Sequence, residues 1–131
     1  MSQKSTFLKA FNNLLTDLME DIELIFPGDK NIKTAKTTVE TMRKANPSIT
    51  IRMWLQHVQA KYGEKILEGD INYFLEKDYS EDVQSMANGN DINKLIEALR
   101  EPIKNMGESN QETTLDYLQK LCKLADAYQN A

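Results

Sequence analysis

The single histidine, His57, and the single cysteine, Cys122, are the first candidates for chemistry in this sequence. A histidine can act as a general base near neutral pH, and a cysteine thiolate is a nucleophile. No Gly-x-Ser-x-Gly sequence or reactive-cysteine signature accompanies them, and no third group that would orient them can be identified. Cys122 also falls on the apolar face of the last expected helix, which favours a buried, inert thiol. We therefore expect no catalytic residues and a protein that is not an enzyme.

The nearest approach to a metal site is the acidic stretch from Asp70 to Glu81. A calcium loop of the EF-hand type needs oxygen ligands at positions 1, 3, 5 and 12, and glycine at position 6. Asp70, Asn72 and Glu81 fit positions 1, 3 and 12, but Phe74 and Leu75 occupy positions 5 and 6. The scattered glycines also form no GxxxxGK or GxGxxG phosphate loop. The pattern favours a solvated acidic surface, and we expect no metal and no cofactor.

Half of the aromatic residues lie between residues 49 and 79. These rings either fill the core of the monomer or anchor a protein interface, in which Trp and Tyr are enriched. A basic segment meets an acidic one in the same stretch, so charge could orient a partner there. We expect this stretch to contribute the main contact surface, through Trp54, Lys61, Tyr62, Lys65, Tyr73, Phe74 and Tyr79.

Charge is segregated along the chain, whose formal net charge is -4. Residues 17–29 contain five acidic and no basic residues, residues 30–65 contain eight basic and two acidic ones, and residues 66–82 contain six acidic and one basic. These blocks either pair within the fold or present oppositely charged faces to partners. The basic segment 30–65, with Trp54 and Tyr62 in it, is the basis of an alternative function, a nucleic-acid-associated or regulatory factor. The acidic segments on either side would repel a long polyanion, which disfavours this alternative function.

The elements that must position these residues follow a helical period. The chain has 131 residues, of which 40% are hydrophobic and 27% charged, as in an ordinary globular domain. Pro27-Gly28, with a left-handed glycine, and Ala45-Asn46-Pro47 are expected to end the first two helices. We expect an all-α fold, a small irregular bundle of about five or six helices. It forms one domain over residues 1–131, with an N-terminal part (5–82) and a C-terminal helical pair (90–129).

Local signals mark further helix boundaries. Asp70 is expected to cap a short helix from Ile71 to Glu76, and Asp91 to cap the first helix of the C-terminal pair. Pro102 should kink or interrupt that helix. Residues 109–112, Ser-Asn-Gln-Glu, fit a capping box with serine as the N-cap of the last helix.

Residues 48–55 fit two patterns. Ile49, Ile51, Met53 and Leu55 alternate with other residues as in a strand, while the wider segment to residue 62 has helical spacing. We prefer the helix because no second strand is available to pair with the first.

The longest apolar runs are a few residues, far short of the roughly 18 needed to cross a bilayer. The N-terminus is polar and lacks the apolar region of a secretory signal. We therefore expect no membrane span, no secretion and a reducing intracellular environment.

Several stretches resemble a family of small uncharacterised helical proteins of large double-stranded DNA viruses of algae and protists. They are residues 22–27 (IELIFP), 32–36 (IKTAK), 43–47 (RKANP) and 69–79 (GDINYFLEKDY), and the resemblance covers about residues 7–82. It implies a viral protein, a minor structural component of the virion or capsid whose partners are capsid proteins. It implies a location in the virion or the host cytoplasm. It supplies no catalytic residues. With this context, the first hypothesis is a non-enzymatic structural protein that docks onto a larger protein assembly.

Overall fold

A computed structural model describes residues 3–76 and 98–131 of this chain. Within these residues 87% are helical and no strand occurs, so the all-α prediction is confirmed. Tyr79, the expected cap Asp91 and the second half of the calcium-like stretch lie outside the described residues.

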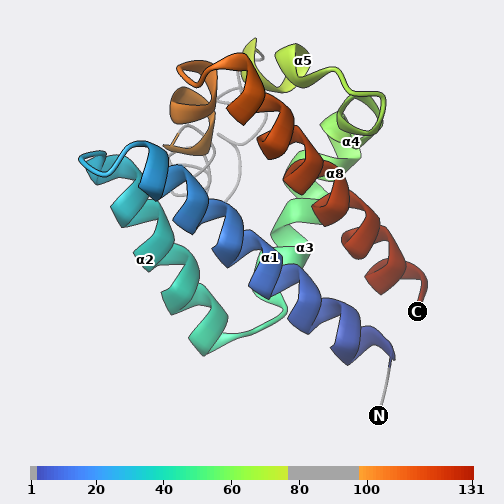
Figure 1. The fold of residues 1–131 in the computed structure, drawn as a ribbon. Coiled ribbons are helices and arrows are strands. Elements are labelled where there is room, and N and C mark those ends of the chain that lie inside the picture. Colours follow the sequence, from blue (N-terminus) through green and yellow to red (C-terminus); the bar gives the residue numbers. More distant parts are fainter. Residues whose placement is uncertain (1–2, 77–97) are drawn as a thin grey trace.

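The two longest helices, α1 (Gln3–Ile25) and α8 (Glu108–Asn130), pack antiparallel and bring the two ends of the chain together (Figure 1). The Lys4 ammonium lies 5.2 Å from the ring centroid of Tyr128 at one end of the pair. Towards the other end of the pair, the Tyr117 hydroxyl donates a hydrogen bond to the Asp21 carboxylate. This hydrogen bond, together with burial, raises the pKa of Tyr117 to about 12. The apolar stripes of both helices meet in one core, which contains Phe11, Leu15, Leu18, Met19, Ile22, Leu118, Leu121, Cys122 and Ala125.

Helix α2 (Lys30–Ala45) folds back along α1 to form a hairpin. The Asp29 carboxylate accepts hydrogen bonds from the backbone N–H groups of residues 31 and 32, so Asp29 caps the helix. The helix ends before Asn46-Pro47, and α1 ends at Ile25, as the sequence predicts. The expectation of a left-handed glycine at Gly28 is wrong, because its φ is not positive.

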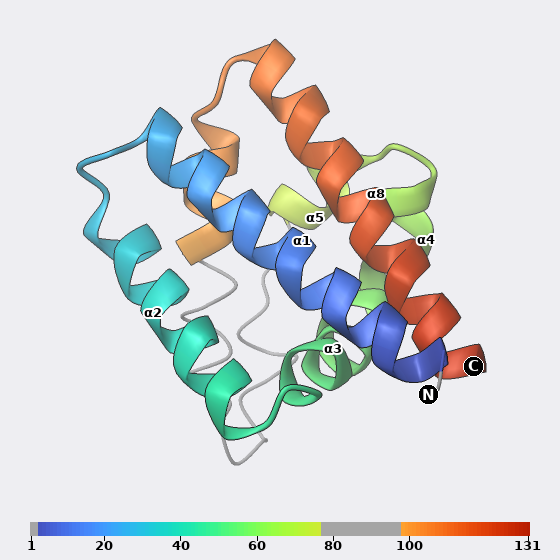
Figure 2. The ribbon, with the colours of Figure 1, turned by 60° about the horizontal axis from the view of Figure 1, so that its bottom comes forward.

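A continuous helical run follows, made of α3 (Ile49–Trp54), the π-helical turn η1 (Leu55–Gln59) and α4 (Ala60–Leu67). The strand alternative for residues 48–55 is therefore wrong. The run packs against α1 and α8 and passes behind both in Figure 2. Its buried positions recur at helical spacing, which is why helix prevails: Ile51, Trp54, Val58, Tyr62 and Ile66.

The short helix α5 (Ile71–Glu76) is followed, beyond the undescribed segment, by a helix over residues 98–104 that leads into α8. Pro102 lies buried within that helix, which ends two residues later. The capping box predicted at residue 109 is wrong: α8 begins at Glu108 with Gly107 as N-cap and no side-chain cap. The Gln111 amide instead donates to the carbonyl oxygen of Ile103 at 2.9 Å, which ties the new helix to the preceding one.

Candidate protein-interaction site

Trp54 and Tyr62, two of the residues predicted for an interface, lie in the core with 7% and 1% of their surface exposed. The Trp54 ring packs edge-on against Phe11 at 5.9 Å, and its Nε1 donates to the Gln59 side-chain oxygen at 3.0 Å. In this fold neither ring is presented to a partner. The alternative that aromatic residues fill the monomer core therefore applies to these two.

Tyr73, on α5, is 40% exposed. The Tyr73 ring contacts the ring of buried Tyr62, and the two ring centroids lie 5.7 Å apart. The Lys65 ammonium lies 5.8 Å from the Tyr73 centroid, within the range of a cation–π contact, and 3.8 Å from the Glu68 carboxylate. The nearby Leu67, at the end of α4, is 47% exposed. We call the region where α4 meets α5 the α4–α5 corner, and it lies at the upper right of Figure 1. Its residues are Lys65, Leu67, Glu68, Gly69 and Tyr73.

Two remaining interface candidates, Lys61 and Phe74, lie on α4 and α5 respectively, but their side chains lie outside what the structure describes.

Backbone hydrogen bonds hold the α4–α5 corner in one conformation. Gly69 adopts φ +91°, which side-chain-bearing residues rarely adopt. The N–H of Asp70 donates to the carbonyl of Lys65 at 2.8 Å, and that of Gly69 to the carbonyl of Ile66 at 3.0 Å. This is the Schellman arrangement that closes a helix C-terminus. Gln119 of α8 donates to the Ile66 carbonyl at 3.0 Å and thereby anchors the corner to the longest helix pair.

Asp70 also caps the N-terminus of α5, because its carboxylate accepts a hydrogen bond from the backbone N–H of Tyr73 at 3.2 Å. The predicted cap is confirmed. Among the described residues, no group of three or more His, Cys, Asp or Glu side chains is arranged to hold a metal ion.

His57 and Cys122 are both buried, His57 within the π-helical turn and Cys122 on α8. Burial raises the pKa of the Cys122 thiol to about 11, although a hydrogen bond with Trp54 acts in the opposite direction. The thiol is therefore protonated at neutral pH and is a poor nucleophile. The prediction of a buried thiol is confirmed.

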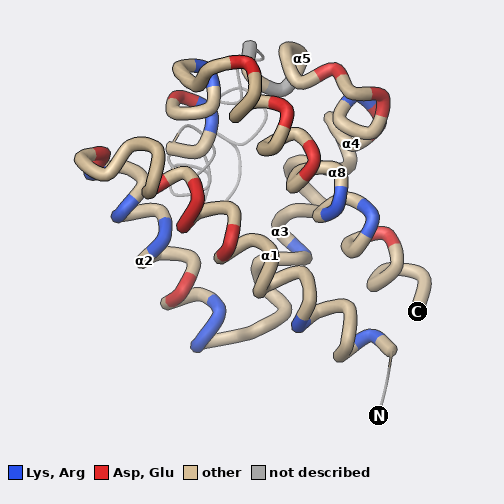
Figure 3. The backbone as a smooth tube through the Cα atoms, viewed as in Figure 1, with Lys and Arg blue, Asp and Glu red and all other residues tan. Residues whose placement is uncertain are grey.

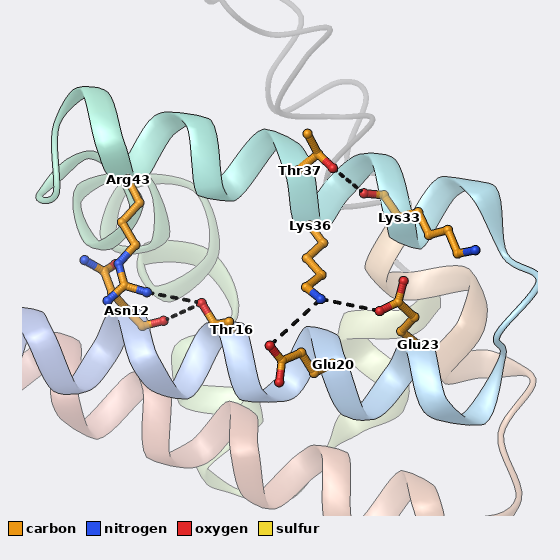
Figure 4. A network of polar contacts seen from close by, with 8 residues as sticks. All are labelled: Asn12, Thr16, Glu20, Glu23, Lys33, Lys36, Thr37 and Arg43. Atoms are coloured by element: carbon orange, nitrogen blue, oxygen red, sulfur yellow. Dashed lines mark hydrogen bonds and ion pairs between the residues drawn. The ribbon is translucent and has the colours of Figure 1, made fainter.

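Part of the basic segment is paired with the acidic block inside the fold. The Lys36 ammonium lies between the carboxylates of Glu23, at 3.4 Å, and Glu20, at 3.9 Å, both on α1 (Figure 4). The Arg43 guanidinium donates to Asn13 at 2.8 Å and to Thr16 at 3.4 Å. These contacts hold α2 against α1, so Lys36 and Arg43 already have binding partners on α1.

A groove that sequence reasoning missed lies at the open end of the α1–α2 hairpin. Its volume is about 580 Å³, and its lining is formed by Ser5, Leu8, Lys9, Asn12, Glu40, Arg43, Lys44 and Pro47. The floor is held by Asn12, which is buried, donates to the Pro47 carbonyl at 2.9 Å and accepts from the Thr50 hydroxyl. No local pattern signals this groove, because it exists only where two helices and the following turn meet.

Comparison with protein-family models, with curated proteins and with solved structures finds no match to this chain. The helical content of the described residues defines it as a small all-α protein. In the part of the chain that the structure describes, no helix is long and apolar enough to cross a bilayer.

Proposed function

We propose that this chain is a non-enzymatic protein-interaction module that docks its α4–α5 corner onto a larger protein assembly. The observation that carries the proposal is the exposure of two large apolar side chains, Leu67 and Tyr73, on either side of a turn that hydrogen bonds hold rigid. A rigid site loses little conformational entropy on binding, and Tyr is enriched among the residues that dominate interface energetics. His57 and Cys122 are buried, which supports a role without catalysis.

The charges of the corner indicate the partner's surface. Lys65 stands beside the Tyr73 ring and is only loosely paired with Glu68, so its ammonium is available to a carboxylate of the partner. The partner surface that fits is an apolar depression with a carboxylate placed opposite Lys65. In such an interface the buried apolar contact supplies most of the affinity and the rim charge supplies orientation.

The resemblance to small proteins of large DNA viruses supports a capsid lattice as the assembly, with this chain as a minor capsid component. The nucleic-acid alternative receives less support, because Lys36 and Arg43 of the basic segment already contact α1. Salt separates the two functions. Phosphate contacts weaken steeply between 50 and 200 mM salt, whereas an apolar interface does not.

The test places a photo-crosslinking amino acid, p-benzoylphenylalanine, at position 73 and, as a matched control, at exposed position 123 of α8. Particles or complexes that contain the chain are irradiated and the products identified by mass spectrometry. We expect one large protein to be captured from position 73 and not from position 123, and its yield to fall when Leu67→Asp is added. Equal capture from both positions, or capture that Leu67→Asp leaves unchanged, would contradict the proposal.

A further inference from the structure

The helical run formed by α3, η1 and α4 contains one turn of π-helix, η1. In it the N–H of Ala60 donates to the carbonyl of Leu55, five residues earlier, where an α-helix would use the fourth. The turn therefore holds one extra residue and rotates the following helix by about 100° relative to an uninterrupted α-helix. Because α4 carries the buried Tyr62 and Ile66, the turn decides whether these side chains face the same core as Trp54.

The Gln59 side chain closes this turn. Its Oε1 accepts a hydrogen bond at 3.0 Å from the indole N–H of Trp54, five residues earlier. Trp54 is buried, packs against Phe11 of α1 and shares a hydrogen bond with the Cys122 thiol of α8. Gln59 thus ties the turn to a side chain that is fixed in the core. η1 contains no Lys, Arg, Asp or Glu, so no ion pair within the turn can replace this bond (Figure 3).

Gly63, one turn further along the run, makes room for the Gln59 side chain. Its φ is not positive, so the backbone does not require glycine, and a glycine within a helix is destabilising relative to alanine. A Cβ atom at position 63 would lie 2.9 Å from Cγ of Gln59, and the three atoms nearest to it all belong to that side chain. Carbon atoms in contact lie about 3.5–4.0 Å apart, so an alanine at position 63 and the observed Gln59 conformer exclude each other.

We propose that Gln59, Trp54 and Gly63 form a latch that holds the π-helical turn closed, and that the turn acts as a hinge between α3 and α4 when the latch opens. An unusual turn, a destabilising glycine and a hydrogen bond to a core tryptophan all meet at the Gln59 side chain. π-helical turns are rare and are frequently found at functional sites. The proposal does not rest on the proposed function, because none of the three residues belongs to the α4–α5 corner.

The alternative is that the packing of α4 against α8 alone holds the turn. The two explanations predict different effects of alanine at position 63. If packing alone holds the turn, alanine strengthens the helix as it does at an ordinary interior position. If the latch holds it, alanine displaces Gln59 from Trp54, and the gain in helix propensity is offset by the lost hydrogen bond.

The experiment measures backbone amide exchange at residues 60–63 by NMR, with the amides of α1 as internal reference. In the unmodified chain, exchange at residues 60–63 should depend little on urea below the unfolding transition, because a hinge opening exposes little surface. Gln59→Ala and Gln59→Met, of which the second keeps a long side chain without the oxygen, should each speed this exchange about fivefold, as expected for one lost hydrogen bond. A urea dependence as steep as that of α1 would mean that the turn opens only when the whole chain unfolds, and would overturn the hinge.

Gly63→Ala in two backgrounds separates the latch from packing. In the otherwise unmodified chain it should not slow exchange at residues 60–63. In the Gln59→Ala background the same substitution should slow exchange about fivefold, the effect of helix propensity alone. Equal slowing in both backgrounds would overturn the proposal and assign the turn to packing.

The indole N–H of Trp54 reports on the latch directly. Trp54 is the only tryptophan, so its indole gives one resonance, which should shift in Gln59→Met and in Gly63→Ala. Gln56→Ala is the matched control, since Gln56 is an exposed glutamine of the same turn, and it should change neither the indole resonance nor the exchange. Circular dichroism verifies the fold of each variant. An indole resonance unmoved by Gln59→Met, or equal effects of Gln56→Ala and Gln59→Ala, would contradict the latch.

Discussion

Replacing Tyr62 and Tyr73 by alanine in two separate variants tests the division between core and surface in the middle of the chain. The two residues are of one type, their rings touch, and they differ in burial, with 1% of Tyr62 and 40% of Tyr73 exposed. Truncating a buried aromatic side chain costs about 3–5 kcal/mol, through lost burial and the cavity left behind. Tyr73→Ala leaves no enclosed cavity, so its cost should stay near 1 kcal/mol or less.

The assay is urea unfolding of both variants and the unmodified chain, followed by circular dichroism at equal protein concentration. Tyr62→Ala should lower the free energy of unfolding by about 3 kcal/mol or more and the melting temperature by about 10 °C. Tyr73→Ala should unfold close to the unmodified chain. Equal losses of stability in the two variants, or a greater loss with Tyr73→Ala, would refute the reasoning from burial.

Three further predictions concern the turn, the thiol and the ion pair. Gly69→Ala should destabilise the chain by about 1–2 kcal/mol in urea unfolding because of its positive φ, whereas Gly28→Ala, with no atom near the added carbon and no positive φ, should change stability little. Burial raises the pKa of Cys122 in the folded chain from 9.0 to about 11, so the free energy of unfolding should fall as the pH rises from about 9 to 11. Cys122→Ala should remove this part of the pH dependence of stability. An unchanged pH dependence in that variant would contradict the raised pKa of Cys122. Lys36→Met should cost about 0.5–1 kcal/mol at low salt and less at high salt, because it removes a partly exposed bridge to two carboxylates, while Lys33→Met on the exposed face should cost nothing measurable.

The sequence predicted the class of fold because helical periodicity is a local property. The stripe of α1 and the stop before Pro47 each depend on residues within one or two turns of the chain. The same holds for Asp70, whose carboxylate caps the helix that follows it directly.

Local reasoning failed at two helix boundaries. Residues 109–112 have the composition of a capping box with Ser109 as N-cap, but the helix begins two residues earlier than that box predicts, at Glu108, and the Gln111 side chain bonds to the carbonyl of Ile103. At Gly28 the composition suits a left-handed turn, but the chain reaches the Asp29 cap without one.

The candidate sites divide in the same way. The sequence by itself indicated that residues 49–79 combine aromatic rings with a change of charge, and it established which residues recur at helical spacing. Only the tertiary structure decided that Trp54 and Tyr62 face the core while Tyr73 and Leu67 face outward, since which face of a helix is buried depends on what packs against it. It alone also created the groove, because the α1–α2 hairpin brings the lining residues together from distant positions in the chain.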